Sequence, residues 1–382
     1  MEIYTDTLTK TENYIICLIR CLMWDQPVPP VPQDLPCRQL LDFSRRHSIE
    51  ALVLRGLHSL DRNGQIDAQW QTRTDIALAQ SIVQLQERDD VIAALTAAGI
   101  DVLPIKGCWL KELYPDINDR QMSDLDMLIH PADAAAAEDI ILRMGYRKDE
   151  VLSHHTLYLK PPYMALELHT ALLPDMDEHE GYYRNIWEKA LPVDGNPRLY
   201  RLSPEAEYLF YLVHLSKHLS DGGSGLRSIL DNTIYARCFP NLDADYLERE
   251  LKTLGLWELT QQVQELSRCW FETGAPIPEG LQPLAQAVCA SGTYGSMTVR
   301  TRQRMDRLRE TYRNPLICLL AYCIPRFFRP LPEMRRQYPI LNKLPFLLPV
   351  FWFVRILSRM LFNKHAFWQK CRLVFREGGK HG

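Results

Sequence analysis

Three carboxylates in two short apolar runs limit what the middle of this 382-residue chain can fold into. Asp124 and Asp126 stand two positions apart in the run SDLDMLI, and Glu167 stands two positions before His169 in the run MALELHT. Alternate residues of a β-strand share a face, so we expect Asp124 and Asp126 to point the same way. Two neighbouring carboxylates repel each other unless a cation lies between them. Mg²⁺ held by carboxylates and substrate phosphates is the common solution, and Mn²⁺ takes similar ligands.

The segments around these carboxylates predict a small sheet with helices between its strands. Pro131 is typical of a first helical turn, and Gly145 stands where that helix would end. An order of strand, helix, strand, helix and strand favours an α+β domain with a small mixed sheet. We predict strands over 101–105, 123–129, 154–160 and 163–170, and helices over 108–114 and 131–144.

Helical patterns flank this sheet on both sides. Ser203-Pro204-Glu205 is a typical helix start, and the helix that follows carries His214 and His218 four residues apart. A glycine-rich break follows that helix. We therefore predict an N-terminal helical region (1–98), the sheet domain (99–200), a second helical domain (201–299) and a C-terminal helical tail (300–382).

The C-terminal tail differs in charge from the rest of the chain. From Arg300 onward it holds eighteen Lys and Arg against four acids, although the whole chain has a net charge of −3. Aromatic and basic residues alternate there among apolar ones. Three interpretations stay open: a segment lying on an anionic membrane, a contact with nucleic acid through stacking and charge, and a helical lid packed on the sheet domain.

The ten cysteines indicate the compartment in which we expect the chain to work. They form no C-x-x-C pair, and most stand in apolar helical runs, as buried reduced cysteines do. No secretory signal is visible at the N-terminus. The most apolar segment, 344–354, is shorter than the roughly 20 residues that a membrane span needs. We expect a cytoplasmic protein, with attachment to the inner face of the membrane as the option that the tail leaves open.

An ordered set of motifs runs through most of the chain. Its pieces are Lys106-Gly107, Tyr114-Pro115, Arg120, Asp124-Leu125-Asp126, Glu167-Leu168-His169, the helix with His214 and His218, Gly225-Leu226-Arg227 with Asp231, Tyr338-Pro339-Ile340, and the segment 344–349. In these motifs the chain is similar to the bacterial "uncharacterised nucleotidyltransferase" family, within the DNA-polymerase-β-like nucleotidyltransferase superfamily, over roughly residues 40–362. The superfamily's usual Gly-Gly or Gly-Ser before the aspartates is Lys106-Gly107 here.

The resemblance implies a catalytic role for the sheet domain and a substrate-side role for the helices of 201–299. Asp124, Asp126 and Glu167 would bind two metal ions, and Glu167 could instead act as a base. Lys106, Gly107 and Arg120 would bind the nucleotide. The candidates for lining the substrate cleft are His169, His214, His218, Arg227 and Asp231.

Each cleft candidate also has a structural interpretation. His169 could orient Glu167 or pack under the sheet. His214 and His218 share a helix face and could form a satisfied buried pair, because the sequence shows no third metal ligand nearby. Arg227 and Asp231 are four residues apart and could form an ion pair within one helix.

The activity we expect is Mg²⁺-dependent transfer of a nucleoside monophosphate from a nucleoside triphosphate such as ATP to a hydroxyl of a small molecule or protein. Pyrophosphate would leave. Nucleotide addition to an RNA end is an alternative enzyme activity. A non-catalytic nucleotide-binding or assembly protein, peripheral to a membrane, is the alternative from another class.

Overall fold

The computed structural model describes residues 7–60, 68–162, 164–293, 295, 297–331, 334–335 and 338–362. The chain divides into two compact units. The first comprises Met1–Lys217 and Ser224–Thr293, and the second comprises His218–Gly223 and Tyr294–Gly382. The last twenty residues of the predicted basic tail, and parts of the predicted N-terminal helical region, lie outside the described residues.

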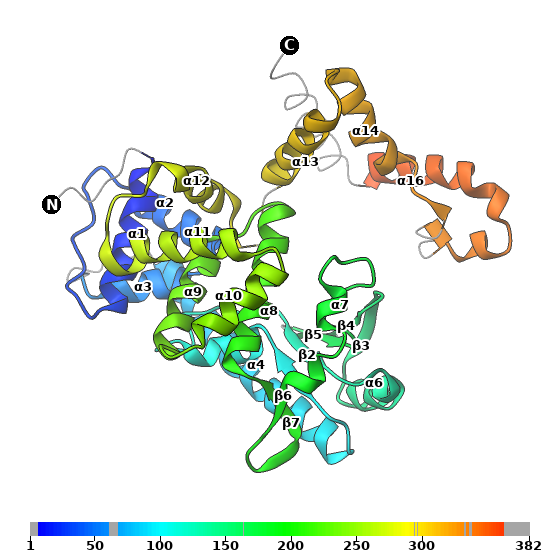
Figure 1. Cartoon of the computed structure of the whole chain (residues 1–382), viewed down its shortest axis with the longest axis horizontal. Coiled ribbons are helices and arrows are strands. Elements are labelled where there is room, and N and C mark those ends of the chain that lie inside the picture. The colour runs from blue at the N-terminus through cyan, green and yellow to red at the C-terminus, as the bar shows by residue number, and fades with distance from the viewer. Residues whose placement is uncertain are drawn as a thin grey trace. The chain divides into compact units, whose positions relative to one another are not determined.

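A mixed sheet lies in the first unit and confirms the predicted α+β fold (Figure 1). Its strands run in the order β1-β2-β5-β4-β3. Only β2 and β5 are parallel, and the other neighbours pair antiparallel. The strands are β1 (Leu103–Ile105), β2 (Leu125–Leu128), β3 (Arg147–Val151), β4 (His155–Lys160) and β5 (Met164–His169).

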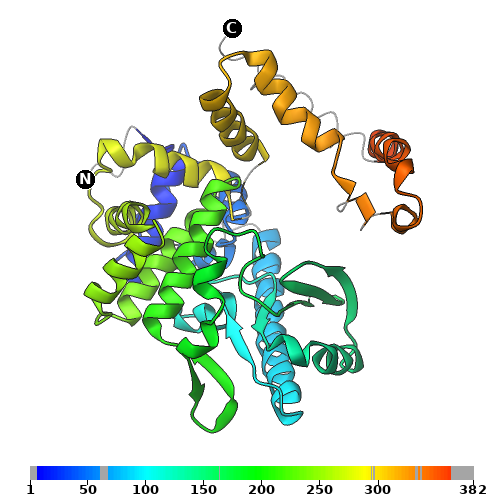
Figure 2. The same cartoon turned by 45° about the vertical axis from the view of Figure 1, so that its right-hand side comes forward.

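The two faces of the sheet pack against different helices. Leu125 and Met127 of β2 belong to a core that also includes α4 (Ala68–Ala97) and α6 (Ala134–Arg143). Figure 2 shows α4, the long cyan helix, running beside the sheet. Leu128 belongs to the other core, which includes α8 (Pro204–Ser220). Because alternate residues share a face, Asp126 lies on the same side as Leu128.

Three strands that the sequence did not predict appear in the structure. β3 reads RKDEV, and every one of its residues is exposed. Such a strand has no alternation of apolar and polar residues, and that alternation is the signal a prediction needs. β6 (Ala190–Val193) and β7 (Asn196–Leu202) form a separate antiparallel hairpin after the main sheet.

Along the chain, the remaining helices of the first unit lie before the strands, between them and after them. The first of them begins at a capping box, in which Thr9 Oγ1 accepts from the Glu12 N–H and the Glu12 carboxylate accepts from the Thr9 N–H. These helices are α1 (Lys10–Met23), α2 (Cys37–Arg46), α3 (Glu50–His58), α5 (Gly107–Leu110), α7 (Glu180–Tyr183), α9 (Leu226–Cys238), α10 (Ala244–Thr253), α11 (Trp257–Arg268) and α12 (Gln282–Ser291).

The second unit is helical where it is described, with α13 (Met297–Thr311), α14 (Pro315–Phe327) and α16 (Leu348–Phe362). It has a small core of Met305, Cys318 and Tyr322. Several large apolar side chains are exposed: Ile317, Leu320, Ile324, Phe346, Val350, Phe353 and Leu357. Among the described residues, no helix is both long and apolar enough to cross a membrane. The membrane, nucleic-acid and lid interpretations of this region stay predictions.

Candidate functional site

The parallel pairing of β2 with β5 brings two of the predicted carboxylates together. Asp126 lies directly opposite Glu167 in the register of the two strands. His169, two residues further along β5, lies on the same face. Its Nε2 atom is 3.0 Å from Asp126 Oδ1 and 3.3 Å from Glu167 Oε2. These three side chains form a group whose ligand atoms all lie within 4.8 Å of one another.

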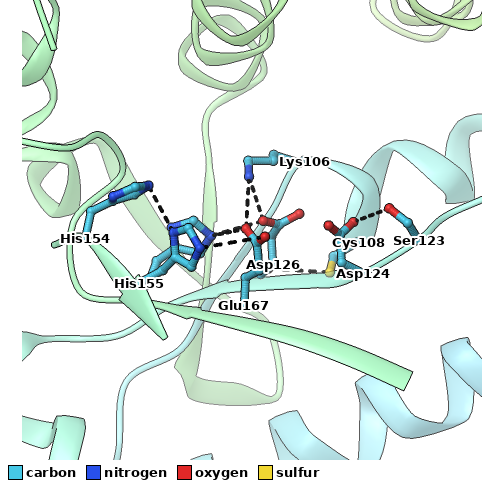
Figure 3. Close-up of polar contacts among 9 residues, drawn as sticks. Lys106, Cys108, Ser123, Asp124, Asp126, His154, His155 and Glu167 are labelled. Atoms are coloured by element: carbon cyan, nitrogen blue, oxygen red, sulfur yellow. Dashed lines mark hydrogen bonds and ion pairs between the residues drawn. The ribbon is translucent and has the colours of Figure 1, made fainter. Parts of the chain in front are cut away.

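Lys106 supplies a positive charge to this group (Figure 3). Its Nζ atom is 2.6 Å from Asp126 Oδ1 and 3.8 Å from Glu167 Oε2. Lys106 is the residue between β1 and α5. Its backbone φ is 52°, a value that residues other than glycine rarely adopt. Such a conformation persists only where the surrounding structure holds it, and it is found most often at functional sites.

Opposing effects set the pKa values of the buried acid and the lysine. Burial alone would raise the pKa of Asp126, but Lys106 and His169 outweigh it and hold that pKa well below its usual range. Burial alone would lower the pKa of Lys106, but Asp126 and Glu167 hold it above its ordinary value. The ammonium is therefore charged and neutralises the carboxylate on the sheet.

Asp124 comes just before β2 and lies on the side of Asp126 away from Glu167 in the view of Figure 3. Ser123 Oγ donates to Asp124 Oδ1 at 2.7 Å. Burial, followed by the charge of Asp126, raises the pKa of Asp124 to about 6. Among the described residues, Asp124 is not part of the closest group of possible ligands. A cation near it would favour its ionised form.

The residues of this site fit a hard divalent cation. Carboxylate oxygens are the ligands that Mg²⁺ and Mn²⁺ prefer, and they converge here from two adjacent strands. The Lys106 ammonium already lies within 4 Å of both Asp126 and Glu167. A site that already stabilises one cation between two carboxylates is suited to another.

Gly107 lies where a larger residue would crowd two neighbouring side chains. A Cβ atom at this position would lie 3.1 Å from both Arg120 Nη1 and Met122 Sδ, which is tighter than ordinary side-chain contacts. Gly107 therefore lets the loop that contains Arg120 close against the start of α5. The predicted contact of Gly107 with a nucleotide stays a prediction.

Arg120 lies in a buried ion pair. Its Nε and Nη2 atoms contact Asp231 Oδ1 and Oδ2 at 2.8 and 3.1 Å, and Tyr114 donates its hydroxyl to Asp231 Oδ1 at 2.6 Å. Asp231 thus pairs with an arginine from a distant segment, which the i,i+4 spacing to Arg227 did not indicate. Arg227 donates from Nη1 to the Gln121 carbonyl at 2.6 Å. Helix α9 therefore holds the loop of residues 114–122, and the predicted contact of Arg120 with triphosphate stays a prediction.

His214 and His218 both lie on α8. Among the described residues, neither belongs to a group of possible metal ligands. The role of these two histidines in a substrate cleft stays a prediction, as it does for Arg227 and Asp231.

Two histidines that were not among the predicted site residues lie beside the carboxylates. His154 Nε2 lies 3.0 Å from His155 Nδ1, and His155 Nε2 lies 3.7 Å from Glu167 Oε1. Burial, then the neighbouring His155, lowers the pKa of His154 to about 4. The signal was present in the sequence, because a His-His pair opens the strand that precedes Glu-Leu-His. In the structure, His155 pairs with His169 in the register of β4 and β5.

Two solved structures have a low similarity to this chain. The crystal structure of ANT(2″)-Ia in complex with adenylyl-2″-tobramycin is 14% identical, with a TM-score of 0.35 over 44% of this chain and 97% of that one. An antigenic nucleotidyltransferase-like protein from Paracoccidioides brasiliensis is 16% identical, with a TM-score of 0.29 over 48% and 92%. Likenesses this low carry no argument about this chain, and no curated protein sequence matches.

The family comparison is stronger than these structural likenesses. The model of a family described as "Uncharacterised nucleotidyltransferase" matches residues 34–272. The match includes the whole mixed sheet, the three carboxylates and the helix that holds Asp231. Because it spans more than half of the chain, the chain belongs to the uncharacterised nucleotidyltransferase family.

Proposed function

We propose that the protein transfers a nucleoside monophosphate from a nucleoside triphosphate to a hydroxyl of a small molecule or protein, and releases pyrophosphate. Membership of the family supports nucleotidyl transfer in general. The observation that carries the finer proposal is the pairing of Asp126 with Glu167, with a lysine ammonium between them. A charge arrangement of this kind suits the phosphates and divalent ions that this reaction brings together.

The carboxylates would hold the ions that this transfer needs. Asp124, Asp126 and Glu167 offer the oxygen ligands, and Mg²⁺ or Mn²⁺ bound there would stabilise charge on the attacking and leaving oxygens. His169 positions two of these acids, because its Nε2 atom lies within reach of both. Glu167 is the more accessible acid of this pair, so it is the better candidate to accept the proton of the acceptor hydroxyl.

Lys106 would change partner when substrate binds. In the free protein its ammonium contacts Asp126, and its side chain remains 22% exposed. A bound cation would take over the neutralisation of the carboxylates. The ammonium would then be available as a point charge for the β- or γ-phosphate.

The experiment measures transfer of label from each of the four nucleoside triphosphates, ATP first, to components of a cell lysate in the presence of MgCl₂. Mass spectrometry identifies what gains a nucleotide. We expect Asp126→Asn and Glu167→Gln each to lower the rate by roughly a thousandfold or more, equivalent to about 4 kcal/mol of the activation barrier. Both substitutions keep the size of the side chain and remove its charge.

The matched control is Glu138→Gln, which removes a carboxylate that pairs with Lys148 on the surface. This variant should keep the full rate. Transfer that continues at the full rate in Asp126→Asn and Glu167→Gln would overturn the proposal. Thermal stabilisation by ATP without any metal dependence would favour the non-catalytic alternative.

A further inference from the structure

We propose that His154, His155 and His169 form a second metal site, which binds a borderline cation of the Zn²⁺ class. Each of the three imidazoles offers one nitrogen, and these nitrogens lie within 4.8 Å of one another. The proposal does not depend on nucleotidyl transfer. It concerns an ion that prefers nitrogen, whereas the carboxylate site suits ions that prefer oxygen.

The three rings already converge. The centroids of His154 and His155 are 4.4 Å apart, those of His155 and His169 are 4.8 Å apart, and those of His154 and His169 are 5.8 Å apart. Three nitrogens at about 2.0–2.1 Å from a tetrahedral Zn²⁺ would be roughly 3.4 Å from one another. Rotations of the His154 and His155 side chains about their χ angles would bring the ligand atoms to this spacing.

His169 has one nitrogen without a partner. Its side chain is almost fully buried, and its Nδ1 atom is a buried polar atom with no hydrogen bond. A buried polar atom in this state costs free energy unless something binds it. Since the Nε2 atom of the same ring lies against Asp126 and Glu167, the Nδ1 atom is the one left to bind a ligand.

The carboxylates complete a pattern that favours metal binding by these rings. A histidine that binds a metal ion usually donates a hydrogen bond from the N–H of its other ring nitrogen to a carboxylate. This bond fixes the ring and makes the ligating nitrogen more basic. His169 Nε2 lies 3.0 Å from Asp126, and His155 Nε2 lies 3.7 Å from Glu167. His155 therefore turns its Nδ1 atom toward His154 Nε2, 3.0 Å away. His155 thus turns one nitrogen toward a carboxylate and the other toward His154, and His169 has one nitrogen against a carboxylate and the other without a partner.

The site that follows has three protein ligands and an open position. His154 lies in the bend before β4, His155 opens β4, and His169 ends β5, so the cluster sits at one end of two paired strands. Four-coordinate zinc with three histidines leaves its fourth position to water or to another ligand. The same acids would thus orient the histidines at this site and bind Mg²⁺ at the other.

Calorimetric titration of the metal-free full chain with ZnCl₂, in excess MgCl₂ and without nucleotide, tests the proposal. We expect one zinc ion per chain. His154→Ala and His155→Ala should each weaken zinc binding at least on the order of 10–100-fold, because loss of a ligand costs no less than loss of an outer partner. His58→Ala, on the exposed side of α3, is the control and should leave the Kd unchanged.

Co²⁺ provides a second measurement on the same variants. A tetrahedral Co²⁺ site gives intense visible absorption, which should appear in the parent protein and in Asp124→Asn but not in His154→Ala or His155→Ala. Zinc binding of equal affinity in the parent and both histidine variants would place the ion elsewhere, for example on cysteines. No zinc binding in the parent would also overturn the proposal. Neither outcome bears on transfer from a triphosphate, which Asp126→Asn tests separately.

Discussion

Two clusters of charge lie in the first unit, and they differ in what they leave accessible. In the cluster on the sheet, Lys106 and Glu167 keep 22% and 23% of their side chains exposed. In the cluster between the loop of residues 114–122 and α9, Arg120 and Asp231 keep only 9% and 5%. One set of charges can still reach a ligand, whereas the other is enclosed by the protein.

The two clusters also differ in how completely their charges are matched within the protein. Asp231 receives two contacts from Arg120 and a hydroxyl from Tyr114, so both of its oxygens are occupied. On the sheet, one ammonium is shared by two carboxylates, and a third carboxylate, Asp124, stands nearby with a raised pKa. Charges that are matched within the protein stabilise a loop, and charges left in excess indicate a binding site.

The largest effect on stability is expected at the enclosed cluster. Asp231→Asn should lower the free energy of unfolding by about 3–5 kcal/mol, because it leaves the Arg120 guanidinium buried without a counter-charge. Urea unfolding measures this loss. The double variant Arg120→Met with Asp231→Leu should be more stable than Asp231→Asn, since it removes both charges together. A loss below about 1 kcal/mol would mean that Arg120 reaches water, and the contrast between the clusters would then fail.

Sequence patterns indicated the carboxylates of the sheet cluster, although not His154 and His155, because alternate residues of a strand share a face. The i,i+2 spacing of Asp124 and Asp126, and the alternation along β2 and β5, follow from strand geometry alone. The α+β fold followed from the same alternation. The parallel register that sets Asp126 opposite Glu167 required only that two short strands be neighbours.

The enclosed cluster could not be predicted in this way. Arg120 and Asp231 are 111 residues apart, and a loop arginine looks the same in sequence whether it faces a phosphate or a buried acid. The i,i+4 spacing of Arg227 and Asp231 suggested a local pair, and it gave no sign that Arg120 would contact the same acid. β3 was missed for the opposite reason, because a fully exposed strand has no apolar face for the sequence to reveal.

An intermediate effect is expected from removal of the cation on the sheet. In the absence of metal, Lys106→Met should lower the free energy of unfolding by about 1–3 kcal/mol, because Asp126 and Glu167 lose the ammonium that they contact. MgCl₂ should then raise the Tm by more than it does in the parent protein. Thermal unfolding with and without MgCl₂ measures both changes.

The control for this substitution is Lys148→Met, which breaks a half-exposed pair with Glu138 and should change stability by less than about 0.5 kcal/mol. An unchanged response of Lys106→Met to MgCl₂ would show that the ammonium and the metal do not share a place. The charges of the sheet cluster would then be matched within the protein, as those of Arg120 and Asp231 are, and would not be open to a metal ion.

The smallest effect on stability is expected at the ion pair between Arg55 and Asp119, which lies on the loop of residues 114–122. Arg55 Nη2 contacts Asp119 Oδ2 at 2.7 Å, but Arg55 keeps 40% of its side chain exposed while Asp119 keeps 2%. When Asp119→Asn removes the charge, Arg55 can turn to water. We expect the free energy of unfolding at about pH 7 to change by less than about 1 kcal/mol. Urea unfolding of this variant beside Asp231→Asn compares an arginine that reaches water with one that does not.

The pH dependence of the same pair gives an independent measure of its burial. Burial raises the pKa of Asp119 to about 6, against the opposing charge of Arg55 and with the help of Asp116. Between about pH 4 and about pH 6 the folded state therefore holds a proton that the unfolded state has lost, so stability falls as the pH rises through this window. The slope should be a fraction of the one-proton limit of about 1.4 kcal/mol per pH unit, and Asp119→Asn should abolish it. The stability of the parent protein relative to Asp119→Asn could instead rise over this window. That result would show that the charge of Arg55 outweighs the burial of Asp119, and that this partly exposed ion pair stabilises the fold.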